Sequence, residues 1–173
     1  MDKFWFCVVL LALSGCSATP SLQEYYVSKS EDPNFLVIDI PTSILGIDKN
    51  ALTQEEQEAL NSFQKLNVLM FRKTTTNAAQ LPDELATVRT IINSKNFDPL
   101  LMMSDKQYSG KLVLEGTVER PDEIVFFGAG DEGFLLARLI GRNMQVEKAM
   151  LLANLVQRGN GLENAVKAIG KMF

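Results

Sequence analysis

The fold is decided by residues 111–140, which read KLVLEGTVERPDEIVFFGAGDEGFLLARLI. In the first part of this stretch apolar and charged residues alternate: Leu112, Leu114 and Val118 against Lys111, Glu115 and Glu119. This alternation is typical of a strand with one face in the core and one face in water. Apolar runs at Glu123–Phe127 and Phe134–Ile140 predict further strands, separated by turn residues at Arg120–Asp122 and by a glycine-rich loop. The stretch therefore predicts consecutive antiparallel strands.

Helix and strand signals surround this region. Capping boxes at Ser21–Glu24 and Thr53–Glu56 mark helix starts, and Pro82 with acidic residues behind it marks another. The other expected elements are helices over Leu22–Ser28, Thr53–Leu66, from Pro82 and over Gln145–Arg158, and strands over Phe35–Ile40, Asn67–Arg72 and Leu100–Ser104. Their order predicts an α+β fold, an antiparallel sheet with helices packed mainly on one face. We expect a single domain over residues 22–158, followed by an amphipathic C-terminal tail over residues 159–173.

Each predicted helix carries apolar residues that are expected to pack on the sheet, and after the first helix these residues recur at helical spacing. In chain order they are Tyr25, Tyr26 and Val27; Ala59, Leu60, Phe63 and Leu66; Leu85, Val88, Ile91 and Ile92; and Val146, Met150, Ala153 and Val156. The composition agrees with a packed domain, because 46% of the residues are hydrophobic and 22% are charged.

Charge and residue content exclude several classes of function. The formal net charge is -4, which argues against binding nucleic acid and against attachment to anionic lipids through basic residues. The chain contains no histidine, so it lacks the commonest general base and the usual nitrogen ligand of metals. We therefore expect no catalytic cluster, no cofactor and no metal site.

The N-terminus has the pattern of a bacterial lipoprotein signal. An apolar run, Phe4–Leu13, leads into Leu13-Ser14-Gly15-Cys16, a lipobox in which small residues precede the cysteine that receives lipid. The run is too short to span a membrane, which takes about 20 residues. We expect residues 1–15 to be a signal peptide and residues 16–21 to be a tether lipidated on Cys16. The alternatives are a buried N-terminal strand and a disulfide between Cys7 and Cys16.

The lipobox also predicts where the protein is located. Bacterial lipoproteins as a class carry a diacylglyceryl group and an amide-linked chain such as palmitate, and more than one acyl chain gives stable anchoring. Ser17, rather than an aspartate, follows Cys16. By the enterobacterial sorting pattern this favours the outer membrane, with the domain in the periplasm.

The loop Gly128–Gly133 matches the dinucleotide-binding pattern G-x-G-x-x-G. Asp131 and Glu132 would place carboxylates where the phosphates must sit, and no strand ending in an acid follows about 20 residues later. A hairpin loop in which glycine supplies a positive φ explains the pattern better.

Other residues are expected to have structural roles. Glu55, Glu56 and Glu58 suit a solvated helix face rather than a catalytic pair, and Asp39 is expected to point outward or bond a neighbouring group. Met102 and Met103 face opposite ways on a strand and suit core packing rather than a soft metal. Tyr25 and Tyr26 are expected to dock the first helix rather than contact a partner.

Three stretches are similar to one known family. They are SLQEYYV (residues 21–27) with Asp32–Phe35; IPTSIL (residues 40–45) with Leu52-Thr53 and EALNSF (residues 58–63); and Gly133-Phe134 through Arg138–Gly141 with Asn143-Met144. On these residues the chain from Ser21 to about Arg158 resembles the small Bacteroidetes lipoproteins classed as domain-of-unknown-function family 4252. That resemblance implies no catalytic residues, and it favours the hairpin interpretation of the glycine loop.

These observations lead to one main hypothesis of function. We expect a non-enzymatic envelope lipoprotein that is held at the membrane by lipid on Cys16 and binds a protein partner or acts in regulation. The alternatives are a carboxylate-dependent hydrolase of an envelope glycan, which needs carboxyl groups about 5–10 Å apart, and a carrier of a small apolar ligand.

Overall fold

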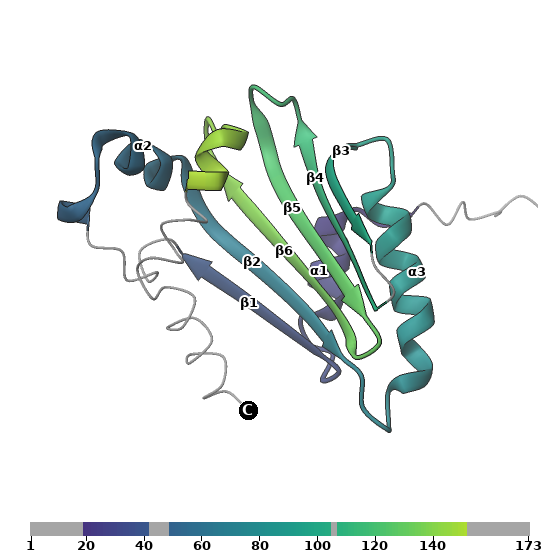
Figure 1. Ribbon diagram of the computed structural model, residues 1–173. Helices are drawn as coiled ribbons and strands as arrows, with labels where there is room; N and C mark the ends of the chain where they lie inside the picture. The colour runs from purple at the N-terminus through teal and green to yellow at the C-terminus, as the bar shows by residue number, and fades with distance from the viewer. Residues whose placement is uncertain (1–18, 42–48, 105–106, 152–173) are drawn as a thin grey trace, which may run out of the picture.

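The computed structural model describes residues 19–41, 49–104 and 107–151. In these residues a single open sheet of antiparallel strands has the order β1-β2-β6-β5-β4-β3 (Figure 1). The strands are β1 Phe35–Pro41, β2 Phe63–Arg72, β3 Phe97–Ser104, β4 Tyr108–Gly116, β5 Pro121–Gly130 and β6 Gly133–Gly141. The helices are α1 Leu22–Lys29, α2 Gln54–Ser62 and α3 Leu81–Ile92, with 3-10 turns η2 Lys49–Ala51 and η3 Ala78–Gln80, and residues 146–151 begin a further helix. The predicted α+β class is confirmed.

The connections explain this strand order. β1 and β2 pair at one side of the sheet, and α3 then carries the chain to the opposite edge, where β3 begins. From there β3, β4, β5 and β6 follow one another as an antiparallel meander, as the sequence pattern predicts. The meander ends when β6 pairs with β2, so the last strand lies between the two parts of the sheet.

One face of the sheet, here called the covered face, packs against α1 and α3. The core contains Tyr25 and Tyr26 of α1, Val88 of α3, and Leu69 and Leu136 of the sheet, all buried. Aromatic rings extend this core: Phe71 stacks on Phe134 at 5.7 Å between ring centroids, and Phe35 contacts both edge-on.

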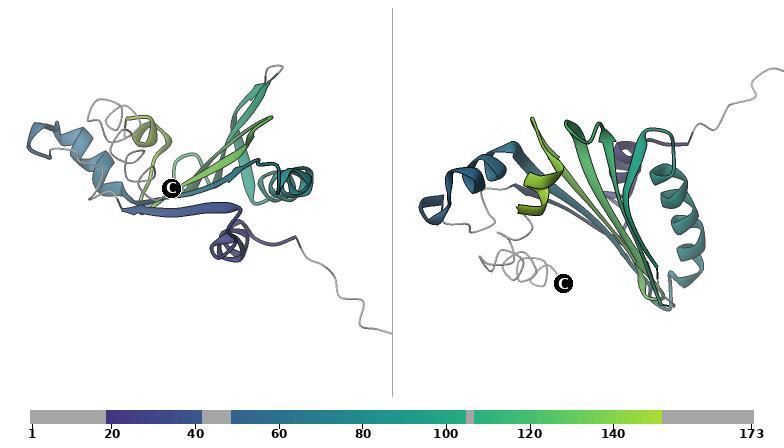
Figure 2. Two further views of the ribbon diagram at one scale, coloured as in Figure 1. Left: turned by 90° about the horizontal axis from the view of Figure 1, so that it is seen from below. Right: turned by 45° about the horizontal axis from the view of Figure 1, so that its top comes forward.

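The opposite face, here called the open face, has a small packed cluster at one end. Leu60 of α2, Phe63 and Met144 are buried there, with Leu139 and Ala149 packed against them. Figure 2 shows the sheet bent, with α1 and α3 outside the bend and with α2 and residues 146–151 on its inner side. The helices along the sheet therefore lie mainly on one face, as predicted.

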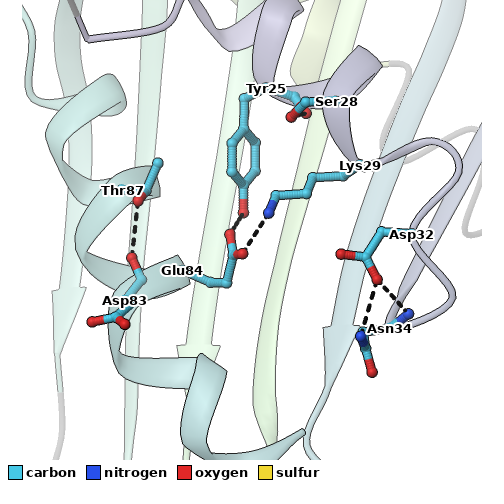
Figure 3. A network of polar contacts seen from close by, with 8 residues as sticks. All are labelled: Tyr25, Ser28, Lys29, Asp32, Asn34, Asp83, Glu84 and Thr87. Carbon is cyan, nitrogen blue, oxygen red and sulfur yellow. Dashed lines mark hydrogen bonds and ion pairs between the residues drawn. The ribbon is translucent and has the colours of Figure 1, made fainter. Parts of the chain in front are cut away.

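A network of polar contacts joins α1 to α3. The hydroxyl of Tyr25 donates a hydrogen bond to Oε2 of Glu84 at 2.7 Å, and Lys29 forms an ion pair with the same carboxylate (Figure 3). The ammonium of Lys29 also lies 4.8 Å from the ring centroid of Phe35. Burial, followed by the hydrogen bond to Glu84, raises the pKa of the Tyr25 hydroxyl. Tyr25 and Tyr26 thus dock the first helix, as predicted, whereas Val27 is exposed.

A buried ion pair lies beneath α1. Nε of Arg138 donates to Oε2 of Glu123 at 3.1 Å, and the guanidinium lies 5.0 Å from the ring centroid of Tyr26. The Tyr26 hydroxyl donates to the carbonyl of Leu136 at 3.0 Å. Oε1 of Glu123 has no hydrogen-bond partner within the described part of the chain. The negative charge of the buried Glu123 carboxylate is therefore compensated by Arg138.

The predicted helix Thr53–Leu66 is too long. The capping box at Thr53 forms as expected, but α2 ends at Ser62 and β2 begins at Phe63. Asn67, Leu69 and Phe71 are buried at every second position of β2, while Gln64 is exposed. Pairing of β2 with β6, which begins at Phe63↔Gly141 and has a register shift between Phe63 and Lys65, overrides the helical spacing of the apolar residues. The strand predicted over Asn67–Arg72 is thus the second half of a longer one.

The structure also corrects which side chains face the core. On β4, Val113 packs under the helices, and Leu112 and Leu114 lie on the open face. β4 ends at Gly116 before the exposed Val118. Of the last predicted helix only its start is described, and there Ala149 packs while Met150 is exposed. α3 agrees with prediction: Val88, Ile91 and Ile92 are buried.

Candidate functional site

The expected lipidation site is not among the residues that the structure describes. Cys16, the signal peptide, the Cys7–Cys16 alternative and the tail over residues 159–173 lie outside the described residues. Within the described ranges, no group of three or more His, Cys, Asp or Glu side chains could hold a metal ion. The helices described there include none that is long and apolar enough to cross a membrane.

The glycine loop forms a tight hairpin. Gly130 at the end of β5 pairs with Gly133 at the start of β6, and Asp131 and Glu132 form the turn between them. Gly133 has φ 137°, a left-handed conformation that favours glycine. A Cβ atom there would lie 2.0 Å from the carbonyl oxygen of Phe71. The hairpin interpretation is therefore confirmed, because a strand rather than a helix follows the glycines.

Other glycines of this hairpin let aromatic rings lie flat on the open face. A Cβ atom on Gly128 would lie 3.2 Å from the ring of Phe126, and one on Gly130 would lie 2.9 Å from the ring of Tyr108. On β4, a Cβ atom on Gly110 would lie 3.2 Å from the terminal methyl of Met103. Small residues on the sheet thus create space that larger neighbours partly fill.

Together these side chains line a groove at the end of the open face near the β5–β6 turn. We call it the glycine groove; its volume is about 880 Å³, and its apolar lining includes Met70, Met103, Tyr108, Phe126 and Leu135. Its charged lining residues are Asp131, Glu132 and Arg72. The groove is an apolar, partly aromatic depression with a few charged side chains.

The open face is apolar along its whole length and becomes more exposed toward the glycine groove. The strand register arranges it in rows across the sheet. The first row is Ile40, Leu66, Leu139, Ile124 and Leu114; the second is Ile38, Val68, Ala137, Phe126 and Leu112; the third contains Leu36, Met70, Leu135 and Met103. Leu114 in the first row is 0% exposed, whereas Met103 is 50% exposed and Tyr108 at the far end is 65% exposed.

The outer strand β3 adds exposed apolar side chains beside the groove. Met102 and Met103 do face opposite ways, but the expectation that they pack in the core is wrong, because Met102 is 72% exposed. β3 is an edge strand without a neighbour on its outer side within the described sheet, so its side chains lack the cover that inner strands receive. Exposed methionines beside an apolar groove are typical of adaptable binding surfaces.

The remaining acidic residues have structural roles. Asp39 is exposed and accepts hydrogen bonds from Asn67 and, at 3.4 Å, from Lys65, as expected. Glu55 and Glu58 are exposed, but Glu56 is buried because its carboxylate closes the capping box on the backbone N–H of Thr53.

Sequence reasoning missed one carboxylate pair. Glu115 and Glu123 are direct cross-strand partners on the covered face, and both line a pocket of about 540 Å³ that Ser21 and Phe97 also border. Burial, with the carboxylates of Glu123 and Asp122, raises the pKa of Glu115. The alternation of residues 111–119 had placed Glu115 on a wet face. Only the register of β4 against β5 brings the two carboxylates together.

The geometry defines an α+β domain whose antiparallel sheet has one face covered by helices and one apolar face that ends in a groove. The chain belongs to the family described as Domain of unknown function (DUF4252), whose family model matches residues 25–152. The resemblance seen in the sequence is thus confirmed at the level of the family. Neither the curated proteins nor the solved structures gave a match.

Proposed function

We propose that this protein is a lipid-anchored lipoprotein of the cell envelope that binds an apolar partner in the glycine groove without chemical turnover. The single observation that carries the binding role is the groove itself, with the exposed Tyr108 and Met103 at its edge. Aromatic and methionine side chains gain contact area when they are covered and adapt to different partner shapes. The localisation follows from the lipobox, with Ser17 favouring the outer membrane on the periplasmic side.

The groove predicts a site-specific contact. With a photo-crosslinking amino acid at position 108, irradiated cells should yield a discrete adduct that is absent when the same group stands at the exposed Ala86 of α3. Met103→Asp should abolish the position-108 adduct, because it places a charge in the apolar groove, whereas Ala86→Asp should not. Equal adducts at positions 108 and 86 would count against the groove. An adduct of lipid mass would assign the apolar-ligand alternative instead of a protein partner.

The anchor predicts a matched pair of cysteine variants. Cys16→Ala should remove incorporation of labelled fatty acid and release the protein from membranes, because the sulfur that carries the diacylglyceryl group is gone. Cys7→Ala, inside the expected signal peptide, should label and fractionate like the parent. Equal fatty-acid labelling of the Cys16→Ala variant would rule out the lipobox.

The Glu115–Glu123 pair favours a second candidate function, hydrolysis of an envelope glycan. Carboxyl groups in unequal environments are the usual acid and base of such enzymes, and Glu115 has a raised pKa while Arg138 compensates Glu123. Glu115→Gln should then abolish release of soluble fragments from purified cell-wall glycan. No fragment release by the parent protein removes this candidate.

Glu115→Gln should also change how the free energy of unfolding depends on pH. Because the folded-state pKa of Glu115 is raised, its contribution to stability falls as the pH rises above the unfolded value of 4.5. Glu115→Gln should therefore be more stable than the parent at neutral pH, and the difference should shrink in acid. Urea denaturation at a series of pH values tests this, and a difference independent of pH would contradict it.

A further inference from the structure

The outer strand β3 has an edge whose two halves differ. Within the described sheet it lies at the side opposite β1 and pairs with β4 alone (Figure 1). Its first half carries two features that hinder pairing with a further strand. These are Pro99, which has no N–H group to donate, and a register shift between Pro99 and Leu101. The second half has neither feature, and its pairing with β4 is regular from Leu101 to Ser104.

The second half of β3 also gathers exposed apolar side chains. Leu101, Met102 and Met103 are each at least half exposed and follow one another directly. Leu101 and Met103 point to the open face, and Met102 points to the opposite side. Within the described chain, this part of the strand is thus uncovered on both faces as well as along its outer edge. A further strand would take this apolar surface out of water, which is favourable.

The charge pattern of this edge fits a second copy of the same chain. With a formal net charge of -4, two copies repel each other wherever their acidic surfaces meet. Residues 99–104, which read PLLMMS, carry no charge, so two copies can pair there without placing like charges opposite each other. The other edge strand, β1, carries the exposed Asp39 and ends at Pro41. In the described sheet, β3 is therefore the edge that suits pairing between identical copies.

Antiparallel pairing about a two-fold axis fixes the register of the two copies. Such an axis stands perpendicular to the sheet, so residues that lie opposite each other must point to the same face. Leu101 and Met103 share the open face, and Met102 lies between them. An axis at Met102 therefore places Met102 opposite its own copy and Leu101 opposite Met103 of the second copy.

We propose that two copies of this protein pair antiparallel through the second half of β3, with the two-fold axis at Met102, and so join their sheets. Each copy then covers the exposed side chains of the other. Met103 lines the glycine groove, so Leu101 of the second copy extends the wall of that groove. The pairing does not rest on the proposed binding role, because the edge and its register carry it.

A cysteine at the axis tests the register. Opposite residues of antiparallel strands have Cα atoms about 4.5–5.5 Å apart, which a disulfide can span. Cells that produce the full chain with Met102→Cys should therefore give a disulfide-linked dimer after mild thiol oxidation, beyond the background of the parent with its Cys7 and Cys16. Ser104→Cys is the matched control, since this position is also exposed on β3. In the proposed register it lies about 14 Å from its own copy and should not link.

A charge at the axis gives a second readout in solution. Met102→Glu places two carboxylates opposite each other in the dimer, whereas within one copy the new carboxylate has Lys111 as its cross-strand partner. The variant should stay folded, and its dimer should dissociate about tenfold more readily than that of the parent in sedimentation of the purified full chain. Val27→Glu, at an exposed position of α1, should leave the dimer unchanged.

The link at position 102 decides whether a second copy occupies the edge. No link there above the background of the parent, or links of equal yield at positions 102 and 104, would overturn the proposal. A link from position 102 to a different protein would also overturn it, because the edge would then take a strand of that protein. A position-102 link without any adduct at position 108 would refute the binding role of the groove and support the pairing, so the two failures are distinguishable.

Discussion

Replacing Gly133 with alanine is expected to lower the free energy of unfolding by about 3 kcal/mol. The residue has φ 137°, which alanine rarely adopts, and the new Cβ atom would lie 2.0 Å from the backbone oxygen of Phe71. Backbone atoms of the inner strand β2 must move to relieve this contact, because Gly133 pairs with Arg72 in the same ladder. Urea denaturation followed by circular dichroism measures the loss.

The matched control for this prediction is Gly128→Ala. Its Cβ atom would meet only the ring of Phe126, at 3.2 Å, and no positive φ is involved. A ring can rotate away, so we expect a loss below about 1 kcal/mol. Equal losses for Gly133→Ala and Gly128→Ala would show that backbone conformation at the hairpin does not matter.

The second large effect is expected from breaking the buried ion pair. Arg138→Met should cost about 3–5 kcal/mol, because it leaves the carboxylate of Glu123 buried without its cation. Glu123 and Arg138 are each 6% exposed, so water cannot replace the lost partner easily. Urea denaturation of the Arg138→Met variant beside the parent measures the loss.

A double variant controls for the loss of packing. Glu123→Leu combined with Arg138→Met removes both charges and should recover most of the stability lost by Arg138→Met alone. A double variant as unstable as the single one would show that contacts of the Arg138 side chain, such as that with Tyr26, matter more than charge compensation.

Local signals in the sequence predicted the elements well and their faces less well. The capping boxes at Ser21 and Thr53, the proline at the start of α3 and the meander all form as predicted, because each depends on neighbours in the chain. The predicted end of α2 was wrong, because it depends on the pairing of Phe63 with Gly141, which joins residues far apart in sequence.

The faces of β4 were harder to predict from the sequence for a related reason. The alternation of leucines with charged residues predicted a buried side and a wet side, but both sides of this strand carry apolar residues at its centre. Val113 faces the helices and Leu114 faces the other way, and both are buried. A pattern of period two assigns faces only when one of them is polar. The glycine groove could not be predicted from the sequence either, since its lining comes from separate strands that meet only through their register.

The position of β6 has a consequence for the order of assembly. The last strand of the described sheet is also the one that joins β1 and β2 to the rest. Until residues 133–141 are available, the chain holds an N-terminal hairpin-like pair and a separate C-terminal meander with no ladder between them. Contacts between residues far apart in sequence slow folding. The two parts of the sheet can therefore join only after nearly all of the described chain has been synthesised, so the sheet stays incomplete through most of synthesis.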